Sequence, residues 1–202
     1  MTGVRGVFFD LGGVILRTED HGPRGRLAAR FGMSYQELAR MVFEGGPDDS
    51  GKKASLGLIS EPQHWRDIMR ALGLPEDDYE SFRDEFFAGD ALDMALLAFL
   101  RSLRPTHKTG IISNAWGDMR AWLEAQGQAD AFDTIIISAE VGMAKPAASI
   151  FELALKAAGL RPEEAAFVDD TLENVEASRA LGMRGIHFRS TGQTLEELKQ
   201  LL

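Results

Sequence analysis

The sequence predicts an α/β protein with a parallel, Rossmann-like sheet as its core and an inserted helical cap. Two observations lead to this fold class. Along the second half of the chain, short apolar runs that favour strands alternate with helical patterns, which is typical of a doubly wound parallel sheet. One further apolar run stands alone near the N-terminus, separated from the others by a long stretch of helical patterns. We therefore expect a core domain of residues 1–15 and 91–202, interrupted by a cap domain of residues 16–90.

The expected strands of the core are short and apolar. The first, residues 4–9, ends at Asp10 and two glycines, a pattern typical of a buried parallel strand followed by a loop. Later strands are expected at residues 108–113, 134–138, 165–168 and 184–188. Helices are expected at residues 118–126, 147–158 and 172–181. A terminal helix follows, with Thr194 and Glu197 as its candidate capping box.

The stretch between the first two strands carries regular helix signals and is expected to be helical throughout. Its two candidate capping boxes are Ser34 with Glu37 and Ser60 with Gln63. Large apolar side chains at helical spacing predict that the cap has a core of its own; they are Trp65, Phe82 and Phe86. Residues 93–103 are apolar nearly all round, so we expect this helix to pack onto the sheet.

Composition excludes several classes of protein. With 202 residues, 45% hydrophobic content and a formal charge of -9, the chain is expected to be soluble and globular. Its acidic balance argues against a nucleic-acid partner, and it has no uncharged run long enough to span a membrane. The N-terminus reaches an acidic strand end too soon for a signal peptide, so a cytoplasmic location is expected.

Residue types also limit the chemistry. The sequence has no cysteine, which excludes disulfides, thiolate zinc sites and a cysteine nucleophile. Its four histidines lie far apart, without the spacing that places two on one helical face. A metal site in this chain would therefore use oxygen ligands.

Polar side chains follow several of the expected strands, where open parallel sheets bind their ligands. They are Asp10, Ser113, Asn114, Asp169 and Asp170, with Lys145 at the start of the next helix. Carboxylates crowded in this way repel one another unless a hard cation lies among them, and Mg²⁺ prefers carboxylate, water and phosphate oxygens. The set predicts a site for a metal ion and an anion.

Four segments resemble the motifs of the haloacid dehalogenase-like hydrolases, in order along the core: FFDLGGVIL, IISNAW, EVGMAKP and FVDDTLENVEAS. The inserted helices resemble the helical cap of that superfamily. The D-L-G-x-V form of the first motif, together with the stretch LGLISEPQHW, is similar to a branch with sugar-phosphate phosphatases and the phosphatase half of epoxide hydrolases.

The resemblance implies a Mg²⁺-dependent phosphomonoester hydrolase. Asp10 would attack phosphorus and form an aspartyl-phosphate, with Lys145 and Ser113 as further catalytic residues. The phosphate would be held by Ser113, Asn114, Lys145 and Leu11. The metal would be held by Asp10, the Gly12 carbonyl, Asp169 and Asp170. The partner implied is a small phosphorylated metabolite, such as a sugar phosphate, and the protein would be a monomer or a homodimer.

One position departs from the family's phosphatases, which usually carry a second aspartate two residues after the nucleophile. This chain has Gly12, which cannot protonate a leaving alcohol; general acid catalysis contributes roughly 10²- to 10⁴-fold. One alternative is therefore a protein that binds a phosphorylated metabolite without turnover, and another is a metal-independent haloacid dehalogenase. His21 is a candidate substitute acid. Asn174 is expected to steady the acidic loop or touch the cap, and Trp116 to face the site or cover the sheet.

Overall fold

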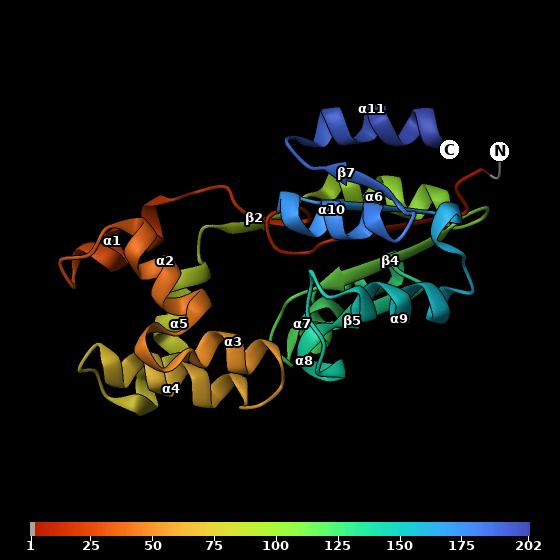
Figure 1. Ribbon diagram of the computed structural model, residues 1–202. Coiled ribbons are helices and arrows are strands. Elements are labelled where there is room, and N and C mark those ends of the chain that lie inside the picture. The colour runs from red at the N-terminus through yellow and green to blue at the C-terminus, as the bar shows by residue number, and fades with distance from the viewer. Residues whose placement is uncertain (1–2) are drawn as a thin grey trace.

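The computed structural model describes residues 3–202. It consists of a layered α/β core and a second body of helices beside one end of the sheet (Figure 1). Among the described residues, no helix is long and apolar enough to cross a membrane.

A parallel, five-stranded sheet forms the centre of the core, in the order β5-β4-β1-β6-β7. Its strands are β1 (Gly6–Phe9), β4 (Lys108–Ser113), β5 (Thr134–Ile137), β6 (Ala165–Asp169) and β7 (Arg184–His187). The α/β fold class and the expected strands are confirmed, with small shifts at their ends. Phe9 of β1 lies level with Ile111 of β4 and Val168 of β6, so these three strands end at one edge.

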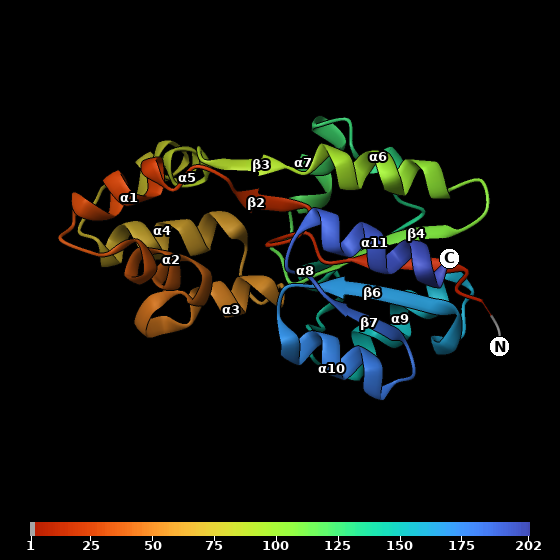
Figure 2. The same cartoon turned by 90° about the horizontal axis from the view of Figure 1, so that it is seen from above.

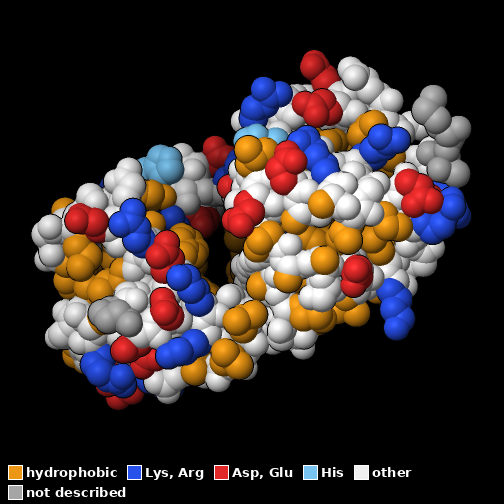
Figure 3. All heavy atoms as spheres, in the orientation of Figure 1, with side chains coloured by type: hydrophobic (Ala, Val, Ile, Leu, Met, Phe, Trp, Pro, Cys, Tyr) orange, Lys and Arg blue, Asp and Glu red, His pale blue; other side chains and the backbone are white. Residues whose placement is uncertain are grey.

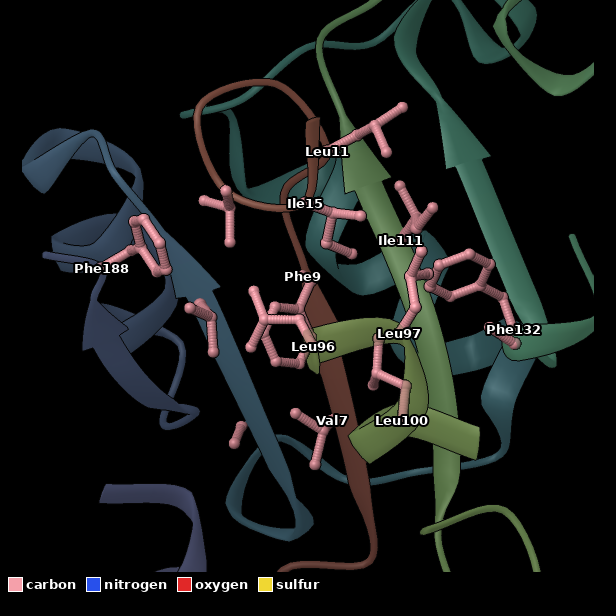
Figure 4. Close-up of a cluster of buried hydrophobic side chains, with 14 of the residues drawn as sticks. Val7, Phe9, Leu11, Ile15, Leu96, Leu97, Leu100, Ile111, Phe132 and Phe188 are labelled. Carbon is pink, nitrogen blue, oxygen red and sulfur yellow. The ribbon is translucent and has the colours of Figure 1, made fainter. Parts of the chain in front are cut away.

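Helices cover both faces of the sheet, as a chain of alternating strands and helices requires (Figure 2). One face is covered by α6 (Met94–Leu103), α7 (Met119–Ala125) and α11 (Thr191–Leu201), and the other by α9 (Ala148–Ala158) and α10 (Leu172–Ala180). Alternate β1 side chains point to opposite faces: Val7 and Phe9 pack with Leu97 and its neighbours (Figure 4), whereas Phe8 packs with Phe151. The expected packing of residues 93–103 onto the sheet is confirmed.

The second body, here called the helical unit, is formed by α1 to α5 and has its own buried core. The helices are α1 (Gly22–Ala29), α2 (Tyr35–Glu44), α3 (Ser50–Ser55), α4 (Glu61–Ala71) and α5 (Tyr79–Phe87). Trp65, Phe82 and Phe86 are buried in one cluster, as expected. Ser34 and Glu37 form the expected capping box of α2.

The expected capping box at Ser60 forms only in part. Ser60 Oγ accepts a hydrogen bond from the Gln63 amide, but the Gln63 side chain donates to Asp67 one turn further on. The prediction for the terminal helix was wrong: Ser190 caps α11 by accepting from the Gln193 amide, and Thr194 is buried inside the helix. Ser190 has the extended backbone of an N-cap, which places the start of the helix earlier than the sequence pattern indicated.

The expectation that the inserted stretch is helical throughout was also wrong. A short antiparallel ribbon of β2 (Leu16–Thr18) and β3 (Asp90–Leu92) joins the helical unit to the core. The helix α8 (Ser138–Val141) and four 3₁₀ segments complete the structure: Gly46–Asp48, Glu76–Asp78, Ala129–Ala131 and Pro162–Glu164. Each strand of the ribbon has only three residues, which is too short to leave a periodic pattern in the sequence. In addition, the two strands that pair with each other lie far apart in the sequence.

The helical unit contacts the core at a second place, away from this ribbon, where α3 lies beside α8 (Figure 1). Ser138 Oγ donates a hydrogen bond to the Ser55 carbonyl. Gly57 has a positive φ of 69°, and a Cβ built there would lie 2.3 Å from the Ala139 carbonyl oxygen. Only glycine permits the two backbones to approach so closely.

A carboxyl pair lies at the same contact. Burial, the hydrogen bond to Asp118 and the charge of Asp118 raise the pKa of Glu61 to about 8. Glu61 also accepts a hydrogen bond of 2.8 Å from the indole N–H of Trp65, so a residue at the start of α4 connects the core of the helical unit to the loop before α7.

We expect the stability of the protein to fall as pH rises from about 5 to 8, and Glu61→Gln to remove part of that fall. The folded state holds the Glu61 proton more tightly than the unfolded state, so this contribution is present at low pH and is lost as Glu61 ionises. Solvent screens the group in part, so we expect an effect on the order of 1 kcal/mol.

Urea unfolding at pH 5, 6.5 and 8 measures this effect. Glu80→Gln, which changes an exposed carboxyl on α5, is the matched control. Glu80→Gln should show the same change of unfolding free energy with pH as the unchanged protein. If Glu61→Gln shows it too, the protonated pair of Glu61 and Asp118 does not exist.

Candidate active site

The carboxyl ends of β1, β4 and β6 bring the expected polar residues together. Asp10 directly follows β1, and its backbone N–H donates to the Val168 carbonyl of β6 at 2.8 Å. Ser113 ends β4 and Asp169 ends β6, so both lie at this edge of the sheet. Side-chain oxygens of Asp10, Asp169 and Asp170 lie within 4.8 Å of one another.

Lys145 bridges two of these carboxylates. Its Nζ lies 2.9 Å from Asp10 Oδ1 and 2.7 Å from Asp169 Oδ2. The ammonium group is almost completely buried, and Asp169 is fully buried. Charged side chains are tolerated in a buried position when they are paired, so the ion pair explains how Lys145, Asp10 and Asp169 can be buried at this edge of the sheet.

Asn114 positions Lys145 through its side-chain amide. Asn114 Oδ1 accepts a hydrogen bond of 2.8 Å from the Lys145 backbone N–H, and Asn114 Nδ2 donates to the Lys145 carbonyl at 2.9 Å. The loop after β4 therefore holds the segment that carries the lysine. Sequence reasoning predicted Asn114 as a phosphate ligand and missed this second contact.

The Asp169 carboxylate is oriented by the start of α10. Asn174 Nδ2 donates to both of its oxygens at 3.1 Å, and the Thr171 backbone N–H donates to Oδ1 at 2.8 Å. Of the two roles expected for Asn174, the structure shows the first, because Asn174 steadies the acidic loop.

The two glycines after Asp10 differ in their surroundings, and only Gly13 lies close to an acidic residue. Gly13 has a positive φ of 80°, and a Cβ there would lie 2.2 Å from Asp170 Oδ2. Gly12 is different, because no atom lies within 4 Å of a Cβ built on it. The Leu11 backbone N–H donates to Asp10 Oδ1 at 2.7 Å, while its side chain is buried.

The charges of this cluster do not balance. Three carboxylates face a single ammonium group, so two negative charges remain when all the carboxyls are ionised. Burial raises the pKa of Asp10 to about 6, and the charge of Asp169 adds to this, while Lys145 opposes it. Hard divalent cations bind such oxygen sets, so the donor set fits a cation of this kind.

Two other candidates lie outside this cluster. His21 is exposed at the start of α1, with its ring edge against Tyr35 at a centroid distance of 5.0 Å. Within residues 3–202, the group of side chains at metal-ligand distance contains carboxylates and no histidine. Trp116 packs against the aromatic cluster of the helical unit, and its ring centroid lies 5.4 Å from that of Trp65. The sequence had left open whether Trp116 faces the site or covers the sheet.

We expect Lys145→Met to destabilise the metal-free protein by roughly 3 to 5 kcal/mol, because two buried carboxylates lose their counter-ion. Loss of the ammonium also raises the pKa of Asp10 further, so the loss of stability is expected to be smaller at pH 5 than at pH 7.5. Urea unfolding in chelator at both pH values tests this, with the exposed Lys156→Met on α9 as control. Equal losses for the two variants would contradict it.

The sequence is similar to that of known hydrolases and phosphatases. A sequence model described as haloacid dehalogenase-like hydrolase matches residues 4–182. The chain is 27% identical to the sesquiterpene phosphatase astK of Aspergillus oryzae, covering 87% of this chain and 99% of that protein. It is also 27% identical to bifunctional epoxide hydrolase 2 of Sus scrofa, covering 98% of this chain but 39% of that relative.

A solved structure shares the fold. It is a haloacid dehalogenase family enzyme from Bacteroides thetaiotaomicron, in complex with magnesium and inorganic phosphate, with a TM-score of 0.75 and 21% identity. The match covers 94% of this chain and 96% of that one. Because the family model matches most of its length, the chain belongs to the haloacid dehalogenase-like hydrolases.

Proposed function

We propose that this protein is a Mg²⁺-dependent phosphomonoester hydrolase that acts on a small phosphorylated metabolite through an aspartyl-phosphate. The observation that carries the proposal is the cluster of three carboxylates with one buried ammonium at the edge of the sheet. The name of astK as a phosphatase and the magnesium and phosphate bound to the Bacteroides enzyme support it.

The proposed reaction has two steps. An Asp10 carboxylate oxygen attacks phosphorus, the bond from phosphorus to the ester oxygen breaks, and the alcohol leaves with a proton from solvent. Water then attacks the aspartyl-phosphate, releasing inorganic phosphate and a free Asp10. Phosphoryl transfer depends mainly on positioning and charge neutralisation. Ser113, the backbone N–H groups of Asn114 and Leu11, and the Lys145 ammonium are proposed to hold the phosphate oxygens.

Asp10, the Gly12 carbonyl, Asp169 and Asp170 would hold the Mg²⁺ ion. When bound, the ion would neutralise the charge shared by the carboxylates and the phosphate. Lys145 contributes in the same direction, because its ammonium lies between Asp10 and Asp169. Asn174 keeps Asp169 oriented in this set. We further propose that residues 16–90 form a cap, whose closure over the site would exclude water.

Gly12 favours a second candidate function, the binding of a phosphorylated metabolite without turnover. At this position the chain has no proton donor for the leaving alcohol, and His21 lies outside the carboxylate cluster. The hydrolase is nevertheless preferred, because the Lys145 ammonium lies 2.9 Å from Asp10 Oδ1, where it would offset the repulsion between this carboxylate and an incoming phosphate.

We expect phosphate release from small phosphomonoesters to require both Mg²⁺ and Asp10. Asp10→Asn removes the nucleophile but keeps the shape of the side chain, so turnover should be abolished while thermal unfolding shows an intact fold. Phosphate release is measured across a panel that includes acetyl phosphate, with Mg²⁺ or with chelator. Equal release by Asp10→Asn would refute the mechanism, and halide release unaffected by chelator would favour the dehalogenase.

We expect Gly12→Asp to increase turnover of esters with poor leaving groups. The space at Gly12 is open and its backbone lies outside the left-handed region, so the fold should accept the side chain. A carboxyl that protonates the leaving oxygen is worth about 10²- to 10⁴-fold. Gly12→Asn, with the same shape and no such proton, is the matched control. A gain that is equal in both variants would mean that proton transfer is not the missing function.

A further inference from the structure

We propose that the substrate of this site is an aryl phosphate, a phosphate monoester of a phenol whose organic part is apolar. This inference rests on the proposed function and specifies its substrate class. Two independent features carry it: an exposed aromatic surface beside the site, and the missing general acid at Gly12.

The aromatic surface consists of Phe43, Phe87 and Trp116, here called the aromatic wall. Phe43 and Trp116 are stacked, with ring centroids 6.3 Å apart and an interplanar angle of 26°. Phe87 lies 6.4 Å from Phe43 and 6.3 Å from Trp116. Phe43 is 49% exposed, and Phe87 and Trp116 are half-buried, so part of this surface is open to a ligand.

The chain connects the aromatic wall directly to the site. Trp116 lies two residues after Asn114, in the loop that holds Lys145. Phe87 ends α5 just before β3, and the partner of β3 is β2, the strand that follows the Gly12 loop. Hydrophobic side chains border the hollow between the helical unit and the core (Figure 3). Short segments therefore join Phe87 and Trp116 of the aromatic wall to the loops of the site, and we infer that the organic part of a bound ester extends toward the wall.

Polar groups beside the aromatic wall are already engaged. The buried Arg24 guanidinium lies over the Phe86 ring and donates to the Phe86 carbonyl, the Tyr35 hydroxyl and Asp90. The Asn114 amide is occupied by the Lys145 backbone. These side chains leave few hydrogen bonds for the hydroxyl groups of a sugar.

The imidazole next to Trp116 is uncharged. His64 is fully buried, with its ring centroid 4.7 Å from that of Trp116. Burial lowers the pKa of His64 to about 4, so its imidazole is neutral at pH 7. The Arg24 guanidinium lies over the Phe43 and Phe87 rings, 5.7 and 5.8 Å from their centroids, but it is buried and paired with Asp90. An apolar ring placed on the exposed part of the aromatic wall would therefore meet mainly carbon surfaces, and aromatic rings favour stacked or edge-on contacts.

The leaving group supplies the second argument. Because Gly12 provides no proton, the departing oxygen must carry its charge until solvent protonates it. A phenol has a pKa near 10, so its oxygen leaves as a comparatively stable anion. An aryl phosphate therefore needs the missing acid least, and its ring matches the aromatic wall.

The test compares two esters with the same type of leaving oxygen, 1-naphthyl phosphate and phosphotyrosine. The first has an apolar body, whereas the second has a charged one. We expect kcat/KM to be at least about tenfold higher for 1-naphthyl phosphate, and Phe43→Ala to lower this ratio by about tenfold. Phe43→Leu should restore part of the ratio, and Leu58→Ala, which truncates an exposed side chain before α4, should leave it unchanged.

The outcomes separate this inference from the proposed function. Turnover of acetyl phosphate with a ratio near one, or a ratio that Phe43→Ala does not change, overturns the aryl class and leaves the hydrolase standing. If no ester is turned over, acetyl phosphate included, the proposed function fails and the aryl substrate class fails with it.

Discussion

The contact of one lysine with two carboxylates at the edge of the sheet is the interaction on which the rest of the structure depends. The parallel register places Asp10 and Asp169 on adjacent strands, so their charges cannot separate. Lys145 compensates these charges, while Asn114 holds its backbone and Asn174 donates to both oxygens of Asp169. The loops after β4 and β6 are therefore parts of one electrostatic unit, and the negative charge that remains is suited to a cation and a phosphate.

Most of the core was predictable from sequence because buried parallel strands are continuous apolar runs that end at polar residues. The strands beginning at Lys108, Thr134 and Ala165 were found in this way. The ribbon of β2 and β3 was not, because its short strands are stabilised by each other across a long separation in sequence. Ser190 was missed as a cap because Thr194 offered a similar local pattern, and only the extended backbone at Ser190 distinguishes the two.

The candidate site was predictable to the level of which side chains meet, but less so in how each is held. Gly12 and Gly13 look alike in sequence, yet one faces open space and the other lies against Asp170. The contact of the Asn114 amide with Lys145 is visible only in the folded structure, since the two residues belong to different loops. Trp116 illustrates the same limit, because its neighbours lie in the helical unit and no periodic pattern links them.

The close approach of Gly57 to Ala139 has a consequence for the size of molecule that reaches Asp10. The helical unit is held on one side by the ribbon and on the other by this backbone contact and the Ser138 hydrogen bond, so the hollow is bounded at both ends. A free small molecule passes between two such attachments without breaking either. A phosphate group on the surface of a folded macromolecule would bring far more bulk into the same space, so we expect small phosphate esters to reach Asp10 more readily than phosphoproteins.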